Sequence, residues 1–126
     1  EDALFDLAKE HGVGLLVRRP MERGVLTGKF KPNQEVASEH RASLEKDRLP
    51  GMIERAETLR TVGEVYSGGM TRMALQFGLG PDAVSCIIPG ARKIEQVEEN
   101  VAASYGGGFS ADVRAQIDAV RDTWEN

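Results

Sequence analysis

The 126-residue sequence predicts an α/β fold in which two neighbouring parallel strands form part of a larger sheet. Its composition, with 40% hydrophobic and 29% charged residues, is that of one ordinary globular domain. Two short apolar runs, 13–17 and 84–88, are typical of strands buried on both faces. Segments with helical spacing flank each run, and right-handed crossovers place such strands side by side. Because two strands do not make a self-sufficient sheet, we expect the chain to be part of a larger α/β assembly.

Charge and hydropathy exclude two classes of partner. The formal net charge of −4 leaves no basic surface for a nucleic-acid backbone. The longest apolar runs are far shorter than the roughly 20 residues that cross a bilayer. The single cysteine, Cys86, cannot form an intrachain disulfide, and the first residues do not resemble a signal peptide. We therefore expect no nucleic-acid partner, no membrane partner and a cytoplasmic location.

The N-terminal half is predicted to contain one helix, one strand and a long loop. A helix over 1–11 carries Leu4, Leu7 and Ala8 on one face and ends at Gly12. The strand 13–17 follows directly. Residues 21–51 are polar and irregular, with several Gly and Pro residues. An ordered loop of this length usually carries function.

The C-terminal half is predicted to alternate between helices and the second strand. Helical spacing returns over 53–62, pauses at two glycines, and continues over 70–79. The strand 84–88 precedes a helix with its apolar positions at Ile94, Val97 and Val101. Ser110 caps a last helix. The residues of that helix expected to face inward are Val113, Ile117, Val120 and Trp124.

Residues 88–100 form the strongest candidate binding segment. Gly90 stands where a strand gives way to a helix, so that a phosphate could approach bare backbone at a positive helix end. Arg92, Gln96 and the pair 99–100 recur at spacings of three and four and so share one helix face. An arginine can bind phosphate or stack on adenine, and the amide and carboxylate groups can pair with the adenine edge. A solvated helix face of ordinary charge content explains the same pattern about equally well.

Other reactive residue types form no recognisable catalytic or metal site. Tyr66 and Tyr105 are expected to be packing or surface residues. His11 and His40 lack metal-ligand spacing and are expected to be structural or solvated. Cys86, inside an apolar strand, is expected to be an inert buried thiol. We predict no catalytic residue and no metal ligand in this chain.

Two segments of the sequence resemble motifs of a known family. Residues 88–100, IPGARKIEQVEEN, are similar to the cofactor-adenosine motif of the aldo-keto reductase superfamily. Residues 19–30, RPMERGVLTGKF, resemble that family's segment after the seventh barrel strand. Both occur in the family's order and spacing, and similar features at 41–44 and 73–77 extend the resemblance over nearly the whole chain.

The resemblance implies a partial (β/α)₈ TIM barrel. Residues 1–126 would form, as a single unit, its carboxyl-terminal part, with 13–17 as strand seven and 84–88 as strand eight, together with their helices and the closing C-terminal helices. Active sites of such barrels lie at the carboxyl ends of the strands. Residues 18–23 and 89–92 fall at these ends.

The resemblance also implies an NADPH site. The residues implied are Pro20, Met21, Glu22 and Gly24 along the pyrophosphate, Thr27 and Lys29 at the phosphates, Arg41 from the long loop, Gly90 and Arg92 at the adenosine 2′-phosphate, and Gln96, Glu99 and Asn100 around the adenine. Arg92, with Lys93 beside it, supplies positive charge for the extra phosphate and so favours NADPH over NADH. Arg18 and Arg19 depart from the family, which usually carries an aromatic or small residue and a serine at these two positions near the nicotinamide.

Family catalysis uses a Tyr proton donor supported by Lys, Asp and often His, all contributed by strands upstream of the matching region. The chain would therefore contribute the NADPH half of an oxidoreductase that transfers hydride to aldehydes or ketones. Expected partners are the cofactor and either the missing N-terminal barrel segment or a second copy of the chain. Two alternatives are a non-catalytic nucleotide-binding or regulatory module and a truncated remnant that self-associates.

Overall fold

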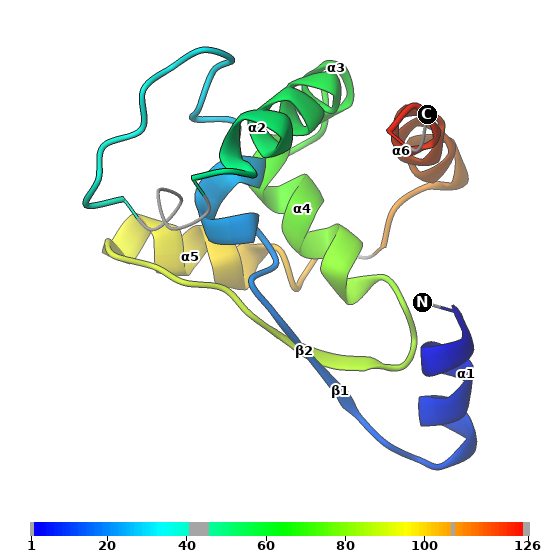
Figure 1. The fold of residues 1–126 in the computed structure, drawn as a ribbon. Coiled ribbons are helices and arrows are strands. Elements are labelled where there is room, and N and C mark those ends of the chain that lie inside the picture. Colours follow the sequence, from blue (N-terminus) through cyan, green and yellow to red (C-terminus); the bar gives the residue numbers. More distant parts are fainter. Residues whose placement is uncertain (1, 41–45, 107, 125–126) are drawn as a thin grey trace.

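The computed structural model describes residues 2–40, 46–106 and 108–124. The elements in chain order are α1 (Asp2–Glu10), β1 (Leu15–Arg18), the 3-10 helix η1 (Glu22–Thr27), α2 (Leu49–Thr58), α3 (Arg60–Gly63), α4 (Gly69–Leu79), β2 (Val84–Ile88), α5 (Ile94–Ala102) and α6 (Ala111–Asp122). The two strands lie side by side, with the helices gathered mainly at their carboxyl ends (Figure 1). No helix in the described ranges is long and apolar enough to cross a membrane.

The predicted parallel pairing of the two strands is confirmed. Leu15 pairs with Val84 and Val17 pairs with Ile87, and the register shifts by one residue after Leu15. The first strand begins at Leu15 rather than at Val13. Val13 is not free to pair with the other strand, because its backbone N–H donates to the Ala8 carbonyl at 2.8 Å and so closes the end of α1. Gly12, with φ of 63°, makes the left-handed turn that this helix end requires.

Only one face of the sheet is covered, which corrects the expectation of strands buried on both faces. Helix α4 lies close against β2, since a Cβ on Gly78 would stand 3.4 Å from Cγ2 of Ile87. On the opposite face Leu16 and Ile88 are 67% and 56% exposed. Cys86 is also exposed there, so the prediction of a buried thiol is wrong. The thiol is accessible because nothing in the described part of the chain packs over this face.

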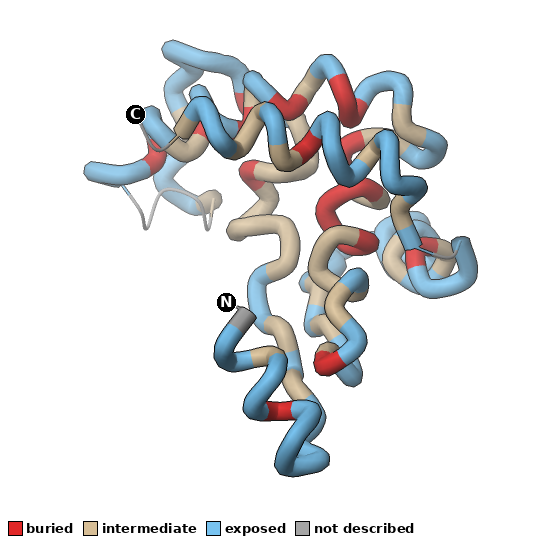
Figure 2. Tube along the Cα trace, turned by 90° about the vertical axis from the view of Figure 1, so that its right-hand side faces the viewer, coloured by how far each residue is buried: buried red, intermediate tan, exposed pale blue. Residues whose placement is uncertain are grey.

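Two helices also leave apolar residues uncovered. In α1, Ala8 is buried but Leu4 and Leu7 are exposed, although the sequence pattern placed all three on one face. In α5 the whole predicted apolar stripe is exposed, with Ile94 reaching 76%. Buried residues instead concentrate at the helical end of the molecule, away from the sheet and α1 (Figure 2). The apolar faces that the sequence pattern marked on α1 and α5 are therefore left largely uncovered by the described residues.

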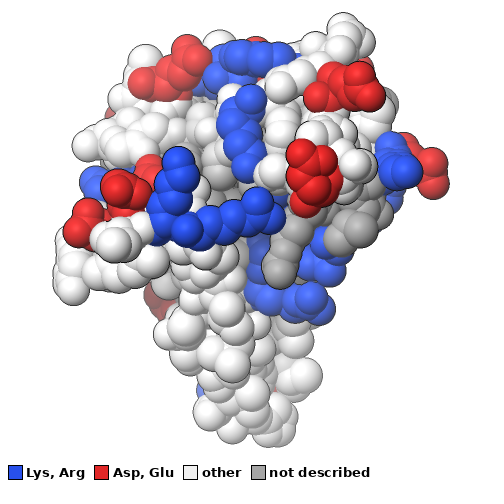
Figure 3. Space-filling view, turned by 90° about the vertical axis from the view of Figure 1, so that its left-hand side faces the viewer, with Lys and Arg blue, Asp and Glu red and all other residues white. Residues whose placement is uncertain are grey.

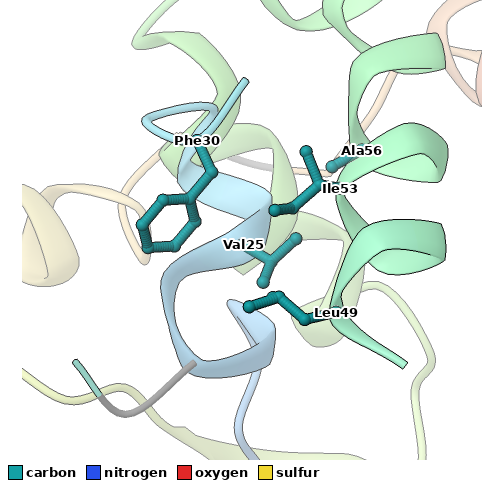
Figure 4. Close-up of a cluster of buried hydrophobic side chains, with 5 residues drawn as sticks. All are labelled: Val25, Phe30, Leu49, Ile53 and Ala56. Atoms are coloured by element: carbon teal, nitrogen blue, oxygen red, sulfur yellow. The ribbon is translucent and has the colours of Figure 1, made fainter. Parts of the chain in front are cut away.

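Two clusters of buried side chains among the described residues lie at the carboxyl ends of the strands. The first joins η1 and the residues after it to α2 (Figure 4), and its buried members are Val25, Phe30, Leu49, Ile53 and Ala56. The second joins α3, α4 and α6, and its buried members are Leu59, Val62, Met70, Met73 and Ile117. The segment 21–51 is thus not wholly irregular, because η1 forms within it. Val25, which is 2% exposed, anchors η1 in the first cluster.

The close approach of α3 to α4 allows a stability prediction. A Cβ added at Gly63 would overlap Sδ of Met70 and lie 2.8 Å from its Cγ, inside the second core cluster. Gly63→Ala should therefore lower the free energy of unfolding by about 1–3 kcal/mol, the usual effect of overpacking. Chemical denaturation measures this change.

Gly51→Ala is the matched control, because Gly51 lies within α2 and a Cβ there meets nothing within 4 Å. It should leave stability unchanged or raise it by up to about 1 kcal/mol, as expected for Ala in a helix. Equal effects of the two substitutions would contradict the packing of α3 on α4.

Candidate functional site

A pocket of about 680 Å³ opens where the two strands end. Its walls are the segment after β1, part of η1, the loop that follows, and the segment that joins β2 to α5. The described residues that line it are Arg18, Arg19, Pro20, Met21, Arg23, Gly24, Thr27, Lys29, His40, Thr71, Ile88, Pro89, Gly90, Ala91, Arg92, Gln96, Glu99 and Asn100. The two segments singled out in the sequence, 19–30 and 88–100, therefore face each other across one cavity.

Ten of the twelve residues predicted at the cofactor line this pocket, and Glu22 does not. Glu22 instead lines a second, more apolar pocket beside η1, α4 and α6. Its backbone has φ of 43°, and its N–H donates to the Arg19 carbonyl at 2.9 Å. Arg41 lies outside the described residues, so its prediction stays a prediction.

The segment after β1 has an unusual backbone. Arg19, Glu22 and Arg23 adopt left-handed conformations with φ of 56°, 43° and 57°. Such conformations are unfavourable for residues with a side chain and tend to gather at functional sites. Short-range hydrogen bonds hold the turn, among them Gly24 N–H to the Met21 carbonyl at 2.9 Å and Thr27 Oγ1 to the Gly24 carbonyl at 2.8 Å. The turn brings Gly24, Thr27 and Lys29 to the same wall of the pocket.

The opposite wall is held by side chains from α5. Gln96 Oε1 accepts a hydrogen bond from the Arg92 backbone N–H at 2.8 Å, and Asn100 Nδ2 donates to the Gly90 carbonyl at 3.5 Å. In this arrangement Gln96 and Asn100 shape the loop that carries Gly90 and Arg92. Gly90 has an unobstructed Cα, since a Cβ there would meet nothing within 4 Å. A ligand can therefore come close to the backbone at this point.

The pocket carries an excess of positive charge although the whole chain is acidic. Among the described lining residues the basic side chains are Arg18, Arg19, Arg23, Lys29 and Arg92, and the acidic one is Glu99. Figure 3 shows Lys and Arg side chains gathered across the middle of the face on the loop and α5 side, with acidic groups around them. Burial lowers the pKa of Lys29, and the Arg92 guanidinium lowers it further. Positive groups from both walls thus repel one another, which favours the binding of an anion.

His40 also lies in this pocket, although the sequence pattern indicated only a structural or solvated histidine. Lys29 Nζ lies 2.7 Å from His40 Nε2, and the Phe30 ring meets the His40 ring edge to face at 4.9 Å between centroids. Sequence reasoning gave no individual ligand role to His40, Arg23 or Thr71. No sequence motif marks these residues. His40 follows Lys29 by eleven residues of irregular chain, and Thr71 stands in the first turn of α4.

Comparison with known proteins places this chain in a family. Residues 1–122 match the sequence model of the aldo/keto reductase family. The chain belongs to that family. Among its aldo/keto reductase relatives, L-glyceraldehyde 3-phosphate reductase of Escherichia coli (strain K12) is 32% identical over 127 residues, which cover 94% of this chain and 36% of the relative.

Solved aldo-keto reductase structures share the arrangement of the chain. The holo form of aldo-keto reductase AKR11C1 from Bacillus halodurans is 30% identical, with a TM-score of 0.66, over 94% of this chain and 37% of that one. Glycerol dehydrogenase AKR11B4 from Gluconobacter oxydans, at 19% identity and a TM-score of 0.70, has the same fold over 92% of this chain and 36% of its own. The chain thus matches a part of the TIM barrel and spans about a third of the length of these relatives.

The two tyrosines lie away from the pocket lining. Tyr66 donates a hydrogen bond to Gln76 Oε1, inside the packing between α4 and the end of α5. Tyr105 is 81% exposed on the loop after α5. The described residues contain no group of three or more His, Cys, Asp or Glu side chains that could hold a metal ion.

Proposed function

We propose that this chain forms the NADPH-binding, carboxyl-terminal portion of an aldo/keto reductase barrel, with β1 as strand seven and β2 as strand eight. The observation that carries the proposal is the convergence of Arg92 with Lys29 and His40 from the opposite wall, at the carboxyl ends of two parallel strands. Enzymes with this barrel bind their substrates and cofactors at that end. In the complete barrel the bound nucleotide supplies hydride to an aldehyde or ketone.

The residues present fit a dinucleotide phosphate. The pocket volume, its basic lining and the unobstructed backbone at Gly90 suit a ligand that is both large and anionic. In this proposal Pro20, Met21 and Gly24 offer backbone along the pyrophosphate, and Thr27 and Lys29 bind its oxygens. Arg92 takes the 2′-phosphate, and Glu99 lies near the adenine together with Gln96 and Asn100. Glu22 contributes only its backbone to the turn beside the pyrophosphate. The cytoplasmic location of the protein stays a prediction.

Gly90→Ala tests this proposal. Its backbone lies outside the left-handed region and its Cβ would point into open space, so the fold should tolerate alanine. The added methyl group would occupy the path of the ligand phosphate, and we expect at least tenfold weaker NADPH binding by calorimetry with no change in thermal stability.

Gly108→Ala is the control, because Gly108 is equally unobstructed but lies outside the pocket lining. It should bind NADPH like the unmodified chain. Unchanged NADPH binding by Gly90→Ala, or no NADPH binding by the unmodified chain, would contradict the proposal.

We also propose that the open face and edges of the sheet receive the remaining barrel strands, or a second copy of the chain when those strands are absent. Unpaired strand edges beside an exposed apolar face are templates for association. The purified chain should therefore form oligomers in sedimentation experiments, and Leu16→Lys, which places a charge on the open face, should shift it towards the monomer.

Val65→Lys is the matched control for this association. Val65 is 82% exposed but lies between α3 and α4, away from the sheet. It should leave the oligomer unchanged. A stable monomer of the unmodified chain, with both strands protected from amide exchange, would show that the sheet needs no further partner.

A further inference from the structure

We propose that the Lys29–His40 pair is a proton-coupled anion site, in which His40 becomes protonated as the diphosphate of the dinucleotide takes over the ammonium group of Lys29. This inference rests on the proposed function and adds to it a residue, His40, and a proton. It is carried by the geometry of the pair within the pocket.

The hydrogen bond within the pair determines the protonation state of His40 before a ligand binds. A charged lysine has three donors and no acceptor, so Nε2 of His40 must accept the 2.7 Å bond from Lys29 Nζ. The ring proton then lies on Nδ1, and the imidazole is neutral. Burial lowers the pKa of His40, the charges of Lys29 and Arg92 lower it further, and among the described residues Glu39 acts in the opposite direction.

The surroundings keep the two groups together. The Phe30 ring meets the imidazole edge to face, and the ammonium group of Lys29 lies 5.0 Å from the centre of the same ring. Gly24 makes room for the pair, because a Cβ there would stand 3.1 Å from Lys29 Nζ and 3.7 Å from His40 Cε1. Both side chains line the pocket that also holds Arg92, so an anion between the two walls reaches all three groups.

Binding of a diphosphate changes the balance of charge around His40. The phosphate oxygens attract the ammonium group of Lys29, which releases Nε2 as an acceptor, and they neutralise the charges of Lys29 and Arg92 that oppose protonation. One proton then passes from solvent to Nε2, and the imidazolium donates a hydrogen bond to a phosphate oxygen. The new N–H bond at Nε2 is balanced by the O–H bond that breaks in a solvent hydronium ion, and no bond between heavier atoms changes. The pKa of His40 is therefore expected to rise on binding.

The sign of the pH effect follows from that rise. When a ligand raises the pKa of a group, binding tightens as the pH falls through the raised pKa and levels off below the pKa of the free protein. Each unit of difference between the two values corresponds to a tenfold change in affinity. NAD⁺ is the suitable probe, because its diphosphate carries no group that titrates near neutral pH, so any proton taken up belongs to the protein.

The experiment is an NMR titration of the histidine Cε1 protons in the full chain, with and without saturating NAD⁺. The sequence contains two histidines, and His11, after α1 and outside the pocket lining, supplies an internal reference signal. We expect the titration midpoint of His40 to rise by at least one pH unit on binding, with a matching tightening of NAD⁺ binding of at least tenfold from alkaline to acidic pH. His40→Gln should lose that pH dependence.

Two lysine variants separate the pair from general electrostatics. Lys29→Met removes the donor to Nε2 and should raise the midpoint of His40 in the free chain. Lys31→Met is the control, since Lys31 lies outside the pocket lining and pairs with Glu57 at 3.9 Å, and it should leave the midpoint unchanged.

The outcomes distinguish this inference from the proposed function. Saturable NAD⁺ binding without a rise in the His40 midpoint would overturn the inference and leave the nucleotide site in place. A rise with NADP⁺ but not with NAD⁺ would assign the effect to the 2′-phosphate and overturn the diphosphate assignment. If neither nucleotide binds at any pH, both the proposed function and this inference fail.

Discussion

Arg92→Ala should weaken NADPH binding by about 1.5–3 kcal/mol, roughly 10- to 150-fold, while NADH binding changes much less. The reason is that Arg92 is proposed to bind the 2′-phosphate, a group that NADH lacks. Gln96 holds the backbone of Arg92 just before α5, because its Oε1 accepts a hydrogen bond from the Arg92 N–H at 2.8 Å. Calorimetric titration of both nucleotides measures the difference.

Arg48→Ala is the control for this substitution. Arg48 is exposed at the start of α2 and lies outside the pocket lining, so its removal changes the net charge equally without touching the site. It should affect NADPH and NADH binding little and equally. Equal losses for both nucleotides with Arg92→Ala would overturn the 2′-phosphate assignment.

The purified chain by itself should show no NADPH-dependent reduction of aldehydes or ketones. Hydride transfer to a carbonyl needs a proton donor near the carbonyl oxygen, and neither Tyr66 nor Tyr105 lines the pocket. Compared with a complete barrel, we therefore expect the chain alone to have no detectable carbonyl reductase activity. The decrease of NADPH absorbance in the presence of an aldehyde measures it.

Binding experiments give the control for this absence of activity. A chain that binds NADPH yet does not oxidise it matches the proposal, because binding and proton donation then reside in different parts of the barrel. Oxidation of NADPH at an enzyme-like rate by the chain alone would show that the assignment of the catalytic groups to other strands is wrong.

Local patterns in the sequence were sufficient to predict most elements of the fold. The apolar runs around Leu15 and Ile87 predicted the parallel pair, and Ser110 indeed caps α6, since its side chain accepts a hydrogen bond from the Val113 N–H at 3.3 Å. Such patterns report which residues are apolar but not what covers them. For that reason they could not show that Cys86 and Ile94 would be exposed.

The candidate site was predictable only in part, for a related reason. The two motifs lie about sixty residues apart, and the resemblance to the family, together with the rule for strand ends, indicated that they face each other. The conformation of the long loop depends on tertiary contacts, such as the Arg60 side chain donating to the Gly28 carbonyl at 2.9 Å. Periodicity contains no information on such contacts, and so His40 was not recognised.

The left-handed turn after β1 sets stability against ligand binding at Arg23. Left-handed backbone at a residue other than glycine is unfavourable by roughly 1–2 kcal/mol, and here Arg19, Glu22 and Arg23 all adopt it. Replacing Arg23 by glycine would relieve that strain but remove a basic side chain from the pocket. The Arg23→Gly variant would therefore be more stable but would bind its ligand less tightly, so selection for stability and selection for binding favour different residues at this position.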